Sequence, residues 1–132
     1  MYDFDYNFIR NGGPIVTCST IGLAFNSGAR ALLGYPESVE IGFDQANNAI
    51  AVREHESESQ NNYYVFEPKE RNGWVRCSMR NFMSYLSQQT GIDFSKKAVQ
   101  FTPKIDKETG LFIVMIDEEH MKNKTQNKTD NS

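Results

Sequence analysis

A group of basic side chains surrounds the single tryptophan of the chain, between residues 69 and 80. Guanidinium and ammonium groups bind phosphates, and an indole ring stacks on a base or packs beneath an arginine. Arg76 on a predicted strand and Arg80 at the start of a predicted helix could bind one phosphate together, helped by the positive end of that helix. The alternative is a tryptophan that lies in the core or is half-buried, beside solvated arginines. The sequence predicts a nucleic-acid-binding surface formed by Lys69, Arg71, Trp74, Arg76, Arg80, Lys96 and Lys97, which Lys104 and Lys107 could extend.

No residue pattern in the sequence indicates catalysis or metal binding. The sequence contains no glycine-rich phosphate loop, no Gly-x-Ser-x-Gly motif and no His-Glu-x-x-His motif. His55 and His120 each lie beside glutamates in polar segments, where we expect them to be exposed. Asp44 and Asp106 begin turns, which an aspartate stabilises by accepting hydrogen bonds from its own backbone. We therefore expect a non-enzymatic protein without a cofactor or a metal ion.

Length and composition are those of one small globular domain. The chain has 132 residues, of which 39% are hydrophobic, and a net charge of −3. This is enough apolar material for a core without help from disulfides or metals. Cys18 and Cys77 lie in apolar or alternating segments without Cys-x-x-Cys spacing. We expect them to be buried thiols rather than a disulfide or a metal pair.

The sequence predicts neither a membrane span nor a secretory signal. The longest uninterrupted apolar run, 111–116, is far shorter than the roughly 20 residues that cross a bilayer. The chain begins MYDFDYNFIR, with acidic residues where a signal peptide has basic ones. We therefore expect a cytoplasmic protein that does not bind membranes.

Charge is distributed unevenly along the chain. Residues 1–66 carry three basic against eight acidic side chains, a net −5, whereas residues 67–108 carry eight against five, a net +3. The basic half favours a polyanionic partner, provided that the acidic half faces away from it. The acidic half favours a different function, docking on a basic protein surface by mimicking phosphates, through Asp3, Asp5, Glu37, Glu40 and the run Glu54–Glu58.

Apolar alternation and turn residues predict the elements of the first half. Tyr2–Phe8 alternate between aromatic and polar residues and predict an edge strand. Strands are predicted over 15–19 and 23–25, and a helix over 28–33 with Asn26 or Ser27 as N-cap and Gly34 just beyond its end. A hairpin follows, with strands over 39–43 and 49–52 joined by a turn at 44–48.

A polar, acidic stretch over 54–62 predicts a solvated connection to the second half. Strands are predicted over 63–66 and 74–77, and then a helix with Ser78 as N-cap that ends at Thr90-Gly91. The run 98–105 predicts one edge or bulged strand, because Pro103 lies inside it. Residues 111–116 predict the most apolar strand, central in a sheet, and 118–132 a disordered polar tail.

The two halves show the same order of elements: strand, strand, helix ending at glycine, and hairpin. The run 16–19 matches 75–78, and Asp44 precedes its apolar strand by the same spacing as Asp106. One unit of about 40 residues buries too little surface to be stable alone, whereas two units can share a core. We expect an α+β fold of two ββαββ-like repeats, 1–53 and 63–117, packed as an intramolecular pseudo-dimer; the alternative is chance similarity of two hairpins.

The first unit resembles a known family. Its runs Val16–Phe25, Ala29–Gly34, Val39–Asp44 and Ala49–Val52 follow one another at the pace of the swapped-hairpin unit of AbrB-, SpoVT-, MazE- and MraZ-type regulators. The resemblance implies an interlocked barrel that binds DNA, with basic residues near the turn glycine and in the helix contacting it. Arg30 takes such a helix position, and the second half would be a diverged copy.

The expected protein is a small non-enzymatic regulator that binds DNA or another nucleic acid through its basic second half. One alternative is an accessory or inhibitor protein that docks on a basic partner through its acidic first half. Another is a purely structural dimer module. A monomer and a homodimer both fit the sequence.

Overall fold

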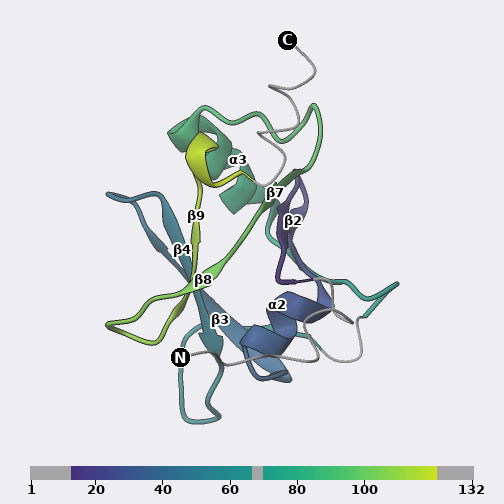
Figure 1. Ribbon diagram of the computed structural model, residues 1–132, viewed down its shortest axis with the longest axis vertical. Coiled ribbons are helices and arrows are strands. Elements are labelled where there is room, and N and C mark those ends of the chain that lie inside the picture. Colours follow the sequence, from purple (N-terminus) through teal and green to yellow (C-terminus); the bar gives the residue numbers. More distant parts are fainter. Residues whose placement is uncertain (1–12, 67–69, 122–132) are drawn as a thin grey trace, which may run out of the picture.

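The computed structural model describes residues 13–66 and 70–121. Within them, short strands form two antiparallel sheets, and the helices lie near the two ends of the sheets (Figure 1). The fold is mixed α+β, as predicted, and consists mostly of strands. The predicted strand over Tyr2–Phe8 and the polar segment beyond residue 121 lie outside the described residues.

The first sheet, sheet A, contains four strands in the order β6-β2-β1-β7. They are β1 (Val16–Cys18), β2 (Gly22–Phe25), β6 (Val75–Ser78) and β7 (Val99–Phe101). Side chains alternate between the two faces of a strand, so burial of one residue exposes its neighbours. Two buried rows cross all four strands on the inner face: Val75, Phe25, Val16, Phe101 and Cys77, Leu23, Cys18, Val99.

The second sheet, sheet B, contains five strands in the order β5-β3-β4-β9-β8. They are β3 (Ser38–Asp44), β4 (Ala49–Glu54), β5 (Tyr64–Val65), β8 (Lys104–Ile105) and β9 (Phe112–Met115). The two sheets share one core, because Phe25 of β2 packs against Phe66 and Phe112 with ring centroids 5.2 and 6.2 Å apart. The apolar run around β9 lies inside sheet B, between β4 and β8.

The helix ends follow local chemistry. Helix α2 (Ser27–Leu32) begins after Asn26, whose side chain accepts a hydrogen bond from the Ala29 amide, so the predicted cap is confirmed. Gly34 follows with φ of +83°, as expected for the residue beyond a helix end. Helix α3 (Arg80–Thr90) buries Met83 and Leu86 and ends at Gly91, which has φ of +79°.

The prediction that Ser78 caps α3 is wrong. Ser78 is the last residue of β6 and pairs with Gly22. The Met79 amide then donates a hydrogen bond to the Ile21 carbonyl, so backbone contact with the β1–β2 turn extends beyond Ser78. Met79 occupies the cap position without a side-chain hydrogen bond.

The prediction of one strand over 98–105 is also wrong. The segment forms β7 in sheet A and β8 in sheet B, separated by Thr102 and Pro103. Proline has no amide hydrogen for a ladder, so pairing breaks there and the chain crosses from one sheet to the other. The second half also lacks an initial hairpin, because β5 pairs with β3 whereas β6 pairs with β2.

The predicted tail begins with regular structure. Residues Glu118–His120 form a 3-10 helix, η1, and the side chain of Asp117 accepts a hydrogen bond from the His120 amide at 2.9 Å. Met121 then forms a bridge with Phe101 of β7. Residues 118–121 therefore belong to the fold.

Cys18 and Cys77 are both buried, as predicted. Each pairs with Leu23 from opposite sides, so one strand separates them. Two strand spacings amount to about 9.5 Å, beyond the Cα separation of a disulfide. Burial raises the pKa of the Cys18 thiol to about 12. Among the described residues, no helix has the length and apolar character needed to cross a membrane.

A substitution at Gly22 tests how closely β2 packs against β6. A Cβ atom there would collide with the carbonyl oxygen of Cys77, which belongs to the backbone and cannot rotate away. We expect Gly22→Ala to lower the free energy of unfolding by about 2–3 kcal/mol in a urea titration. Gly42→Ala is the matched control, since nothing lies within 4 Å of the added carbon. Equal stability of the two variants would contradict the close approach.

Candidate functional site

A groove with a volume of about 680 Å³ lies on the outward face of sheet A. We call it the sheet A groove. Three of the predicted nucleic-acid-binding residues, Arg71, Trp74 and Arg76, line it together. Its remaining lining residues are Thr17, Ala24, Asn72 and Gln100.

Strand register builds the floor of the sheet A groove. Ala24 pairs with Arg76 on one side and with Thr17 on the other, and Thr17 pairs with Gln100. These four residues form one row across the sheet, on the face opposite the buried rows. The middle of the row is low because Ala24 and Thr17 are short, while Arg76 and Gln100 stand on the edge strands β6 and β7.

A tight hairpin over residues 71–74 forms one side of the groove. The Arg71 amide donates to the Trp74 carbonyl at 2.7 Å, and the Trp74 amide donates back at 2.9 Å. Asn72 and Gly73 between them have φ of +53° and +84°, the positive values that a two-residue hairpin turn requires. The turn brings Arg71 back beside the half-buried Trp74, where both line the groove.

A buried arginine of α2 holds this hairpin in place. Arg30 Nη1 lies 2.7 Å from Glu70 Oε1, and Nη2 donates to the Gly73 carbonyl at 2.7 Å. The Arg30 side chain is only 6% exposed. The family resemblance implies that this arginine contacts DNA. In the structure its side chain is buried and joins α2 to the hairpin instead.

The arginines of the groove differ from Arg30 and Arg53 in their partners, although Arg80, outside the groove, likewise forms no ion pair with a described acid. Arg30 and Arg53 both form ion pairs with glutamates. Arg71 and Arg76 are exposed and form no ion pair with any acidic residue of the described ranges. Within the part of the chain that the structure describes, no acid therefore neutralises these two charges through an ion pair.

The other predicted binding residues lie elsewhere. Arg80 lines a smaller pocket of about 250 Å³ between α3 and the segment 93–95, so Arg76 and Arg80 line different pockets. Lys96 and Lys97 are exposed in the segment between α3 and β7. Lys104 belongs to β8 of sheet B and Lys107 to the turn after it, away from the groove row. Lys69 lies outside the described residues.

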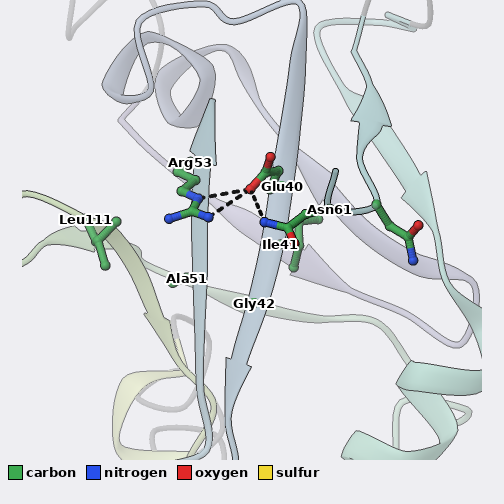
Figure 2. Close-up of a pocket in the computed structure, with 8 residues that line it drawn as sticks. Glu40, Ile41, Gly42, Ala51, Arg53, Asn61 and Leu111 are labelled. Atoms are coloured by element: carbon green, nitrogen blue, oxygen red, sulfur yellow. Dashed lines mark hydrogen bonds and ion pairs between the residues drawn. The ribbon is translucent and has the colours of Figure 1, made fainter. Parts of the chain in front are cut away.

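A second polar cluster surrounds Glu40 on β3. Glu40 Oε1 accepts hydrogen bonds from Arg53 Nε at 3.0 Å and from the side-chain Nδ2 of Asn61 at 3.1 Å, and Oε2 lies 2.9 Å from His55 Nδ1. Figure 2 shows Glu40 between Arg53 and Asn61. These three residues line an open pocket with a volume of about 490 Å³. The pocket is floored by Gly42 and Ala51 of the same two strands.

The Glu40 cluster corrects two expectations. His55 is not exposed, because its side chain is 12% accessible and its ring stacks on Tyr63 with centroids 4.0 Å apart. Glu40 does not belong to an acidic docking surface, because its side chain is only 8% exposed. The spacing of the predicted hairpin is sufficient to predict that Glu40 lies opposite Arg53. No local sequence pattern predicts that Asn61 binds the same carboxylate.

The chemistry of the Glu40 cluster is that of a structural anchor. Hydrogen bonds from Ser59, His55 and Asn61, with Arg53, lower the pKa of Glu40 to about 2. A carboxylate with this many donors has little accepting capacity left for a substrate. It ties the 55–62 connection to sheet B. No group of three or more His, Cys, Asp or Glu side chains suited to a metal ion occurs within the described ranges.

Comparison of the chain with models of known protein families, with curated proteins and with solved structures finds no match. The resemblance to swapped-hairpin regulators therefore stays a prediction from the sequence.

Acid titration tests the Glu40 anchor. Because the folded pKa lies below the ordinary value of 4.5, the charged form stabilises the fold above pH 4.5, and this contribution is lost as pH falls toward about 2. We expect Glu40→Gln to be less stable than the natural chain at pH 7, with a difference that narrows across this pH range in urea titrations. Glu54→Gln, at an exposed neighbouring position, is the control and should change little. A constant difference at all pH values would argue against the anchor.

Tryptophan fluorescence tests the Arg30 contacts. Trp74 is the only tryptophan, so its emission reports on the hairpin alone. We expect Arg30→Met to increase quenching of Trp74 by acrylamide and to lower the free energy of unfolding by about 2 kcal/mol, since two charge-assisted hydrogen bonds are lost. Arg53→Met removes an ion pair in the other sheet and should leave Trp74 quenching unchanged. Unchanged quenching in Arg30→Met would refute the positioning of the hairpin by Arg30.

Proposed function

We propose that this protein is a small non-enzymatic regulator that binds nucleic acid through the sheet A groove. The observation that carries the proposal is that Arg71, Arg76 and Trp74 line one groove, with neither arginine compensated by a described acid. Unpaired guanidinium groups attract phosphates, and the indole offers a flat apolar surface to a base.

The number of positive charges sets the expected strength. Two arginines line the groove, while Arg80 lines another pocket. Each neutralised phosphate contributes about −0.7 to −0.9 to the slope of log K against log salt, so two contacts correspond to a slope of about −1.5. Binding by the groove is therefore weak and only moderately dependent on salt.

The alternative of an acidic docking surface receives less support. Asp3 and Asp5 lie outside the described residues, and Glu40 is buried in hydrogen bonds. Glu54 and Glu56 are exposed and share a pocket with Arg53, whose single charge already pairs with Glu40. Glu37 and Glu58 are exposed as well.

We also propose that the two hairpins of sheet B are copies of one ancestral hairpin. Their strands lie in the symmetrical order β3-β4-β9-β8, with β4 antiparallel to β9. Each turn begins with an aspartate whose side chain accepts a hydrogen bond from a backbone amide at 3.0 Å. Asp44 accepts from Ala46, and Asp106 accepts from Thr109. This arrangement supports an intramolecular pseudo-dimer, although sheet A lacks the same symmetry.

Fluorescence anisotropy with labelled mixed-sequence oligonucleotides tests nucleic-acid binding. We expect saturable binding that weakens between about 50 and 200 mM salt and falls at least about tenfold in the double variant Arg71→Glu/Arg76→Glu, because both phosphate contacts are reversed in charge. The double variant Arg80→Glu/Lys97→Glu changes net charge equally outside the groove and should lose much less. Equal losses would exclude the groove as the site, and absence of binding at tens of micromolar would exclude the function.

A further inference from the structure

The sheet A groove contains uncharged polar side chains whose hydrogen-bonding groups are not in use. The hydroxyl of Thr17 and the amides of Asn72 and Gln100 line it, and none bonds to another side chain or backbone group of the described residues. Hydroxyl and amide groups of this kind bond to the edges of nucleic-acid bases. They are useful only when those edges can reach the groove floor.

The described elements are poorly suited to reading a double helix. The major groove of a duplex accepts a protruding helix or a two-stranded ribbon. Helix α3 has a single charged residue, Arg80, along its eleven positions, and α2 is six residues long with Gly28, Ala29 and Arg30 buried. The hairpin 71–74 has a single bridging residue pair, Arg71 and Trp74, and is therefore too short to serve as a two-stranded ribbon.

The low floor of the sheet A groove suits a flexible strand. Ala24 and Thr17 leave the centre of the row open, with the arginines on one side and Gln100 at the other edge. Four strands side by side span about 14 Å, room for a few unstacked nucleotides lying across the sheet. Unpaired bases are the ones that can turn both a face and an edge toward a protein.

Trp74 is the surface on which such a base can stack. It lies at the end of the hairpin that Arg30 contacts through Glu70 and Gly73, so the backbone that carries the ring is fixed before binding. A pre-positioned backbone loses little conformational freedom on binding. Arg71 and Arg76 line the same groove and can contact the phosphates on either side of the stacked base.

We propose that the ligand of the sheet A groove is an unpaired strand of nucleic acid, with one base stacked on Trp74 and its neighbouring phosphates on Arg71 and Arg76. Thr17 or Gln100 bonds to a base edge. This inference rests on the proposed function and narrows it from nucleic acid in general to single strands.

Competing probes test the inference on the full chain. The probes are a labelled single-stranded DNA of roughly 12 nucleotides, the RNA of the same sequence, and the DNA duplex of that sequence. We expect at least one single strand to bind about tenfold or more tightly than the duplex, and to quench the emission of Trp74 on saturation. The duplex should leave this emission unchanged.

Variants of the ring separate stacking from charge. Trp74→Ala should lose about tenfold in affinity for the single strand, whereas Trp74→Phe keeps a stacking surface and should lose less. Thermal melts of both variants identify a folding defect, and in that case Trp74→Phe alone is compared with the natural chain. Gln88→Ala on α3, in the other pocket, is the control and should bind as the natural chain does.

The outcomes distinguish the two proposals. Duplex binding as tight as single-strand binding, still lost in Arg71→Glu/Arg76→Glu, would refute the inference and leave the proposed function standing. Single-strand binding without quenching of Trp74 would likewise refute stacking. Absence of binding to all probes would refute both proposals.

Discussion

Burial of the inner faces of both sheets around Phe25 is the constraint on which the rest of the structure depends. Phe25 contacts Phe66 and Phe112, so sheet A and sheet B share one core. Because side chains alternate along a strand, fixing the buried rows also fixes what faces outward. A shift of β6 by one residue would bury Arg76 and expose Cys77. The position of the groove row is therefore a consequence of core packing.

Charged side chains fall into two groups that the sequence does not separate. Arg30 and Glu40 are buried, and each joins distant segments: α2 to the hairpin 71–74, and β3 to the 55–62 connection. Arg71 and Arg76 have no described acidic partner. The net charge of a sequence segment counts buried, paired side chains and exposed, unpaired ones in the same way. Only three-dimensional partners show which charges join parts of the fold and which have no described acidic partner.

Local signals predicted most elements, and contacts between distant residues account for the rest. The start of α2 follows from the sequence because the Asn26 side chain accepts a hydrogen bond from the first turn. The ends of both helices follow because Gly34 and Gly91 adopt the positive φ that terminates a helix. Pro103 alone predicts only an edge or bulged strand over 98–105, since nothing local says that the chain passes to the other sheet there. The association of Arg71, Trp74 and Arg76 followed from their proximity in sequence. The floor of Thr17, Ala24 and Gln100 did not, because three separated segments supply it.

The two sheets are interleaved along the chain, with consequences for how the protein is made. β1 pairs with β7, β2 with β6 and β4 with β9, so each sheet needs strands from both ends of the described chain. Pairings between residues so distant in sequence slow folding. During synthesis β1, β2 and β4 leave the ribosome before their partners exist, with open edges that other chains can join. The nascent first half therefore keeps these strand edges unpaired until the second half has been synthesised.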